Sequence, residues 1–114
     1  DVEGLASIIG TIRKIRRKIN PKLEIDGVLI TMADHRTNMT RDMIKAIHTS
    51  YGPHTRIYQA IVPRCTRVGE SLTKSESVLR YSKQCPASTA YRALAKEVEK
   101  GERSRKKHPT ALDR

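Results

Sequence analysis

The sequence predicts an α/β fold with a mostly parallel sheet, and three observations support this class. Apolar residues recur at three- and four-residue spacing over positions 2–19, which is typical of one helix face. Two later segments, 25–32 and 56–62, are apolar without polar alternation, as in strands buried on both faces of a parallel sheet. A helical segment separates them and short connections join the elements, which gives the order helix, strand, helix, strand, helix.

The first helix is expected to end at Asn20, because Pro21 disfavours helical conformation at the residue before it. Cations gather toward its C-terminus, where the helix macrodipole favours them. They are Arg13, Lys14, Arg16, Arg17 and Lys18. A solvated face is the ordinary interpretation of such a run, and a DNA-binding surface is the alternative.

The remaining elements have recognisable ends. The second helix is expected to start with Thr40 as its cap, to carry Asp42 in its first turn and to stop at Gly52. Pro63 closes the second strand, and residues 63–71 are interpreted as the loop that follows it. A final helix starts near Pro86, and one apolar face of it carries Ala90, Tyr91, Leu94, Ala95 and Val98.

The chain is expected to divide into a folded part, residues 1–100, and a basic tail, residues 101–114. Disorder is expected in the tail because the apolar period is lost after Gly101. Strands buried on both faces need neighbouring strands and helices that this sequence does not supply. The sequence therefore predicts part of a larger domain, which suits a length of 114 residues.

Positive charge dominates the composition, with 23 Lys and Arg against 12 Asp and Glu, and a formal net charge of +11. Acidic residues are missing between Gly10 and Leu23 and again between Asp42 and Glu70. This concentration favours an anionic partner, with nucleic acid ahead of a membrane surface. The apolar runs are far shorter than a bilayer span requires, so a cytoplasmic protein is expected.

Several kinds of chemistry are disfavoured by spacing. The six glycines never cluster as a phosphate-cradling loop requires. The four histidines and two cysteines lack the spacing of metal ligands, and Cys65 has no local signature of an activating base. We therefore expect no catalytic residue, no metal site and no cofactor for this chain alone.

The two segments that follow the strands, residues 31–38 and 63–71, are the candidate binding loops. Ligands of open α/β sheets bind beyond the carboxyl ends of the strands. These loops carry Arg36, Arg64 and Arg67, and the planar guanidinium group donates paired hydrogen bonds to phosphate. Spacing alone leaves solvated charge and DNA contact as alternatives.

These loops and their flanking segments resemble the C-terminal part of the ParA/Soj family of chromosome- and plasmid-partitioning ATPases. The resemblance runs from about Leu5 to about Val98, with anchors at residues 3–5, 20–32, 36–38, 61–64 and 91–98. It implies the C-terminal portion of a doubly wound P-loop NTPase fold that is incomplete without its N-terminal half. The full-length parent would use ATP and Mg²⁺ and form ADP and phosphate. Its phosphate loop, signature lysine and Mg²⁺-binding acids would precede the residues seen here.

The resemblance also implies partners and site residues. The partners would be non-specific DNA, a ParB-like protein and, with ATP bound, a second copy of the full-length chain on the nucleoid. DNA contact falls on Arg36 and Arg67. Contact with the nucleotide base falls on Pro63, Arg64 and Cys65, with Thr31 and Met32 as weaker candidates. Cys65 stands where the family usually has Asn, and a thiol is a weak substitute for an amide in hydrogen bonding.

Two other functions compete with this interpretation. One is a stand-alone basic DNA-binding protein that derives from the same fold and lacks ATPase activity, with binding driven by counterion release. The other is a membrane-cycling protein like MinD, which shares the fold. The residues after Gly101 offer Leu112 as their only large apolar side chain, so they cannot supply the apolar face of a membrane-binding helix.

Overall fold

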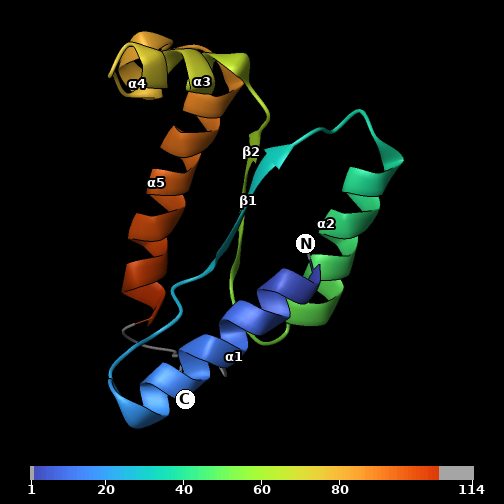
Figure 1. Ribbon diagram of the computed structural model, residues 1–114, viewed down its shortest axis with the longest axis vertical. Coiled ribbons are helices and arrows are strands. Elements are labelled where there is room, and N and C mark those ends of the chain that lie inside the picture. Colours follow the sequence, from blue (N-terminus) through green and yellow to red (C-terminus); the bar gives the residue numbers. More distant parts are fainter. Residues whose placement is uncertain (1, 106–114) are drawn as a thin grey trace.

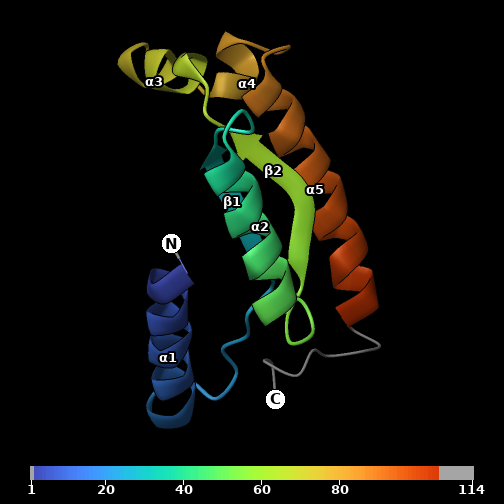
Figure 2. The same ribbon diagram turned by 90° about the vertical axis from the view of Figure 1, so that its right-hand side faces the viewer.

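A parallel pair of strands forms the centre of the fold, with a helix on each side. The computed structural model describes residues 2–105. Strand β1 (Val28–Ala33) pairs with β2 (Ile57–Pro63). Helices α2 (Asn38–Tyr51) and α5 (Pro86–Arg105) lie on opposite sides of the pair (Figures 1 and 2). The predicted α/β class with parallel strands is confirmed, as a sheet of two strands among the described residues.

Helix α1 (Val2–Lys18) confirms the first periodic segment but makes little contact with the rest of the fold. It runs beside the C-terminal end of α2 (Figures 1 and 2). Of its apolar stripe Ile9 is buried, whereas Ile8 is 60% exposed, and Ile19 just beyond the helix is 77% exposed. Much of the apolar face that the sequence predicts is therefore uncovered.

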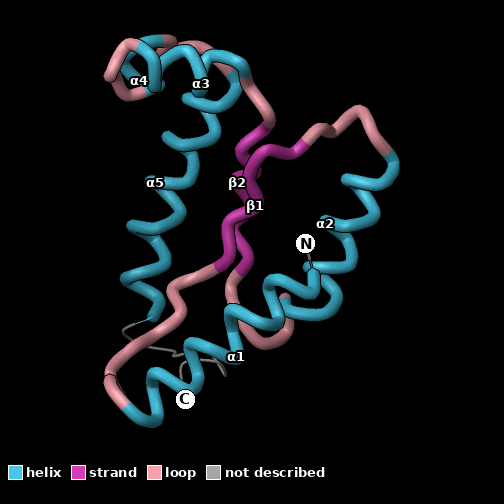
Figure 3. Tube along the Cα trace, in the orientation of Figure 1, coloured by secondary structure: helices cyan, strands magenta, loops and turns pink. Residues whose placement is uncertain are grey.

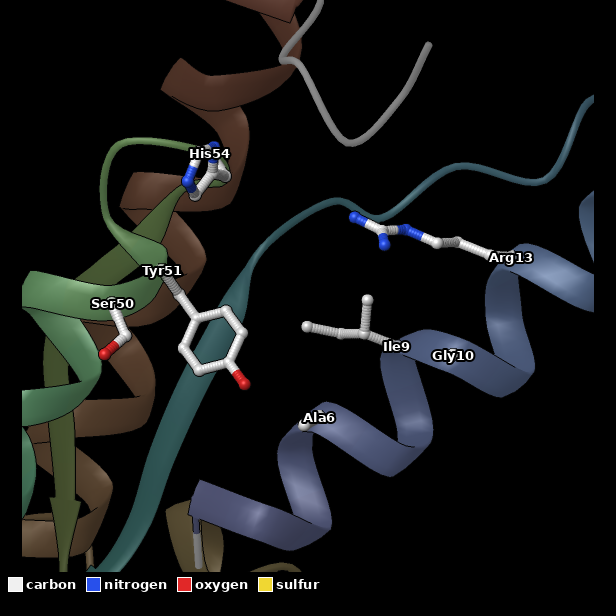
Figure 4. A pocket seen from close by; sticks show the side chains of 7 residues that line it. All are labelled: Ala6, Ile9, Gly10, Arg13, Ser50, Tyr51 and His54. Atoms are coloured by element: carbon white, nitrogen blue, oxygen red, sulfur yellow. The ribbon is translucent and has the colours of Figure 1, made fainter.

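The contact between α1 and α2 leaves a cavity of about 320 Å³. The side chains of Ile9 and Tyr51 point toward each other across it (Figure 4). The rest of its lining comes from Ala6, Gly10, Arg13, Ser50 and His54. A loosely filled gap of this size agrees with the small contact that α1 makes.

Strand β1 begins later than expected, at Val28 instead of residue 25. The preceding Asp26 accepts hydrogen bonds from Arg56 Nη2, at 2.9 Å, and from the Tyr58 hydroxyl, so its side chain is bound to the start of β2. Gly27 allows the close approach, because a Cβ there would lie 2.8 Å from ring carbons of Tyr58. These side-chain contacts take the place of three residues of the predicted strand.

The strands are also less buried than the sequence predicts. Near the end of β1, Met32 is 67% exposed and Thr31 is exposed as well. Residues 28–30 are half-buried. The described residues do not bury the strands on both faces, because two strands and their flanking helices leave the end of β1 open; this agrees with the expectation that the neighbours such strands need are missing from this sequence.

Helix α2 begins three residues earlier than expected. Its cap is Thr37, in an extended conformation, whose hydroxyl oxygen accepts a hydrogen bond from the Thr40 backbone N–H at 3.2 Å. Thr40 is therefore inside the helix, and Asp42 lies beyond the first turn. The expected end is confirmed, because Tyr51 is the last helical residue and Gly52 follows as the C-cap.

Two short helices that the sequence analysis did not predict stand at the carboxyl ends of the strands (Figure 3). They are α3 (Thr66–Thr73) and α4 (Val78–Tyr81). The described core lies beneath them, where Val62, Cys85 and Ala87 are buried. The residues packed around these three are Leu29, Cys65, Val68, Val78, Ala90 and Tyr91. Helices this short carry too few apolar positions to establish a period.

Helix α5 packs along β2 and provides hydrogen-bond acceptors where the strand is irregular. The two-residue step from Val28 to Ile30 faces the four-residue step from Ile57 to Ile61, which indicates a bulge in β2. There the carboxylate of Glu97 accepts hydrogen bonds from the backbone N–H groups of residues 59 and 60, at 2.6 and 2.7 Å. This carboxylate therefore satisfies two donors that the irregular ladder leaves over.

Helix α5 also extends further than the apolar period suggests. It continues through Gly101 to Arg105, so the first five residues of the predicted tail are helical. The remaining residues of that tail, 106–114, lie outside the described residues.

Candidate nucleotide and nucleic-acid interface

Two cavities open at the carboxyl ends of β1 and β2. Pro63, Arg64, Cys65 and Thr66 line both of them. The smaller cavity, about 490 Å³, is completed by residues 33–36. The larger, about 530 Å³, reaches toward α3 and α5. The backbone N–H of Arg64 donates to the Ala33 carbonyl at 2.9 Å, so the two loops are hydrogen-bonded where the cavities meet.

All five residues proposed for base contact line the larger cavity: Thr31, Met32, Pro63, Arg64 and Cys65. The sequence analysis missed the apolar part of the wall, which comes from Val62, Val68, Leu72 and Tyr91. Tyr91 belongs to the apolar face predicted for α5, so its helix position was a usable signal. Leu72 is 75% exposed on an unpredicted helix, so the sequence held no comparable signal for it.

Met32 has a backbone conformation that methionine rarely adopts. Its φ of 54° lies in the left-handed region, which is sterically unfavourable for residues other than glycine. The exposed side chain forms part of the larger cavity. Strain of this kind persists where surrounding structure imposes it and is common at ligand sites. Met32 therefore combines a strained backbone with a place in the wall of the larger cavity.

Cys65 occupies the N-cap position of α3. Its backbone is extended, with φ −148° and ψ 124°, and its side chain makes no capping hydrogen bond. The side chain lies half-buried against the core cluster and also lines both cavities. Sequence reasoning placed Cys65 in a loop after the strand, whereas the structure fixes it at the junction of β2 and α3.

Arg36 is held by a local carboxylate. Its Nε and Nη2 donate to the two carboxylate oxygens of Asp34 at 3.0 and 3.1 Å, and its backbone N–H donates to Asp34 Oδ1 at 3.1 Å. The Arg36 side-chain and backbone hydrogen bonds lower the pKa of Asp34 to about 2. The Arg36 side chain is nevertheless 90% exposed, so it remains open to solvent anions.

Arg67 lies in the first turn of α3, not in a loop as the sequence analysis expected. Its Nη1 is 3.0 Å from Glu70 Oε2, which also accepts a hydrogen bond from the Tyr81 hydroxyl at 3.1 Å. The Arg67 side chain is 56% exposed. Arg36 lines the smaller cavity and Arg67 lines neither, so the two predicted DNA contacts stand outside the larger one.

Both arginine ion pairs are weak enough to open. Exposed ion pairs contribute about 0.2–1 kcal/mol, because solvent screens the charges and ordering two side chains costs entropy. A phosphate can therefore compete for either guanidinium group, and Arg64 adds a third cation at the same end of the sheet. The arrangement can hold a flat apolar ligand in the larger cavity and anionic groups at its rim.

Metal-ligand clusters and membrane-spanning helices are both absent among residues 2–105. This part of the chain holds no group of three His, Cys, Asp or Glu side chains that could bind a metal ion. Within the same residues, every helix is too short or too polar to cross a bilayer.

Curated relatives show what this sequence is similar to. The chromosome partitioning protein ParA of Caulobacter vibrioides is 38% identical over 104 residues, which is 91% of this chain. The chain is similar to ParA/Soj partitioning proteins. The sporulation initiation inhibitor protein Soj of Bacillus subtilis is 31% identical, and the chromosome-partitioning ATPase Soj of Thermus thermophilus is 29% identical, each over 97 residues. No protein-family model matches the sequence.

The ParA/Soj resemblance predicted from the two loops is thus confirmed. The chain spans 38% of the length of each of those three relatives. The alignment with the Caulobacter protein covers 104 of the 114 residues. It therefore includes both strands and the loops at their carboxyl ends. The candidate residues therefore sit within the segment that is similar to partitioning proteins.

Proposed function

We propose that this chain is the C-terminal segment of a ParA/Soj-type partitioning ATPase. Its part would be to contribute DNA-contacting arginines and one wall of the nucleotide-base pocket. The observation that carries the proposal is the meeting of five base-contact candidates around one cavity, with Arg36 and Arg67 exposed beside it. Similarity to proteins named for chromosome partitioning supports the same role.

The larger cavity suits a nucleotide base. Met32, Val68 and Leu72 offer apolar surface to a flat ring, while Thr31 and Arg64 provide polar groups at the margin. Cys65 contributes a weak donor and acceptor where an amide is usual, so base recognition here depends more on packing and backbone groups. Bound ATP would supply the phosphoryl group whose transfer to water drives the cycle.

In the whole protein this segment would complete a doubly wound sheet. The exposed end of β1 and the uncovered face of α1 are surfaces that further strands and helices would bury. The phosphate loop, signature lysine and Mg²⁺-binding acids would belong to that other half. The complete ATPase would form an ATP-dependent homodimer on the nucleoid, within the cytoplasm, and respond to a ParB-like partner.

DNA contact is proposed to occur through Arg36 and Arg67, each of which would exchange its carboxylate for a backbone phosphate. Binding of this kind has no sequence preference, because phosphate contacts carry no base information. Each phosphate neutralised also releases counterions, so affinity falls steeply as salt increases.

The test is fluorescence anisotropy of a labelled random-sequence duplex across a salt series. The test variant carries Arg36→Glu and Arg67→Glu. The matched control carries Lys14→Glu and Arg17→Glu on the exposed face of α1, so both variants have the same net charge. We expect the arginine variant to reduce the slope of log affinity against log salt by about 2, and the control to change it little.

The outcome separates the two DNA-binding interpretations. Loss of binding in the arginine variant alone supports a localised interface at the carboxyl ends of the strands. Equal losses in both variants indicate diffuse electrostatic binding, which favours a stand-alone basic DNA-binding protein and contradicts the assignment of these two arginines. Far-UV circular dichroism of each variant verifies that charge reversal has not unfolded the chain.

A further inference from the structure

The two cysteines, which are twenty positions apart in sequence, meet in the core near the carboxyl ends of the strands. Cys85 is buried with Val62 and Ala87, and the half-buried Cys65 packs against this cluster. Both are free thiols. A sequence without a short Cys-Cys spacing gives no sign of this meeting, which the fold alone creates.

Each cysteine also stands at the start of a helix. Cys65 is the N-cap of α3, and Cys85 directly precedes Pro86, the first residue of α5. Burial raises the pKa of the Cys85 thiol, but hydrogen bonds with Ser88, Cys65 and Ser82 lower it to about 7. The Cys85 Sγ to Ser88 Oγ distance is 3.4 Å.

Access to solvent differs between the two sulfur atoms. Cys65 lines both cavities at the carboxyl ends of the strands, so a small solute can reach it. Cys85 is 9% exposed and lines neither cavity. The pair therefore combines an accessible thiol, which an oxidant can reach, with a shielded thiol beside it that can convert the oxidised form to a disulfide.

We propose that Cys65 and Cys85 form a redox-active pair that a hydroperoxide oxidises to an intramolecular disulfide. This modification does not depend on the proposed DNA or nucleotide contacts. It would tie the start of α3 to the start of α5 and withdraw the Cys65 thiol from the cavity wall.

The two steps balance without another reactant. The Cys65 sulfur attacks the hydroperoxide, the O–O bond breaks, and Cys65 becomes a sulfenic acid while water or an alcohol leaves with the thiol proton. The Cys85 thiolate then attacks the Cys65 sulfur. The S–S bond forms, the S–O bond breaks, and the hydroxide that leaves takes up a proton as water. Two electrons pass from the thiols to the peroxide.

The experiment treats the reduced 114-residue chain with hydrogen peroxide and follows intact mass, thiol alkylation and non-reducing electrophoresis. We expect a monomer that has lost two hydrogens, resists alkylation at both cysteines and recovers on reduction with dithiothreitol. In a matched sample in denaturant, the fold no longer holds the two cysteines close together. Folding should make disulfide formation at least about tenfold faster than in that sample.

Single variants assign the two roles. Cys85→Ser should accumulate a sulfenic acid at Cys65, which dimedone traps, whereas Cys65→Ser should react much more slowly with peroxide because Cys85 is shielded. Disulfide formation no faster in the folded than in the denatured chain would overturn the proposal. Exclusively intermolecular disulfides, or a Cys65→Ser variant as reactive as the unaltered chain, would overturn it too.

Discussion

A single methyl group added at Gly101 tests the contacts that Arg56 makes with Asp26 and Tyr58 near the start of the strands. Gly101 is buried in α5, and a Cβ at this position would overlap with the guanidinium group of Arg56. Gly101→Ala must therefore displace Arg56 from its site. The variant asks how much that site contributes to the free energy of unfolding.

The contacts of Arg56 set the magnitude. Its Nη2 lies 2.9 Å from Asp26 Oδ2 and 3.0 Å from the Tyr58 hydroxyl, and the guanidinium carbon lies 4.7 Å from the centre of the Tyr58 ring. Because Asp26 is 45% exposed, we assign the ion pair about 1 kcal/mol and the cation–π contact about 0.5–1 kcal/mol. Replacing a helical glycine by alanine returns about 0.5–1 kcal/mol. The expected net loss is about 1 kcal/mol.

Urea denaturation followed by circular dichroism measures the effect. Gly10→Ala and Gly69→Ala are matched controls, because both glycines are helical and a Cβ at either would meet no atom within 4 Å. We expect the controls to gain about 0.5–1 kcal/mol in the free energy of unfolding, since only the helix propensity changes. Gly101→Ala should instead unfold at lower urea than the unaltered chain.

A second background separates the Arg56 contacts from any other cost. In Arg56→Ala the guanidinium group is absent, so adding Gly101→Ala should stabilise the chain as the control substitutions do. Stabilisation by Gly101→Ala in the unaltered chain would refute the reasoning. An equal destabilisation with and without Arg56 would refute it as well, because the cost would then come from elsewhere.

Two further predictions follow from single carboxylates. Glu97→Gln should lower the free energy of unfolding by about 1–3 kcal/mol and speed hydrogen exchange at the amides of Gln59 and Ala60. In the unaltered chain the two oxygens of one charged carboxylate accept from both N–H groups, and an amide has a single acceptor oxygen. Unchanged exchange would contradict this. In an NMR titration Asp34 should have a midpoint near 2. In Arg36→Gln the midpoint should rise but stay below its ordinary value of 3.8, because the backbone N–H of residue 36 still donates to the carboxylate. Because the folded pKa is lowered, the stabilisation is complete above about pH 4 and is lost as pH falls through about 2; equal midpoints would contradict the pairing.

Elements with a strong local period were predictable. Seven apolar positions at helical spacing indicated α1, and two mainly apolar segments located β1 and β2 to within a few residues. Their ends were less predictable, because side-chain contacts decide them. The Thr37 hydroxyl starts α2, and Asp26 turns toward Arg56 and Tyr58 before β1 begins.

The sequence predicted the part of the candidate site that lies at the strand ends, but not the rest of its lining. Parallel strands bring their carboxyl ends together, so placing Thr31 and Met32 beside Pro63, Arg64 and Cys65 needed only the order of elements. The apolar wall from Val68, Leu72 and Tyr91 needed the packing of α3 and α5, which no local pattern encodes. The carboxylate partners of Arg36 and Arg67 likewise became visible only with the backbone conformation, a turn for Arg36 and helix α3 for Arg67.

The sequence by itself determined the α/β class, the excess of positive charge and the likeness to partitioning proteins, because composition, periodicity and matched segments are local or linear properties. Tertiary structure alone decided which distant groups meet. It brought Cys65 to Cys85, Glu97 to the bulge in β2, and Gly101 to Arg56. Such pairs depend on how α5 packs across the strands, and that packing is settled by the burial of many side chains at once.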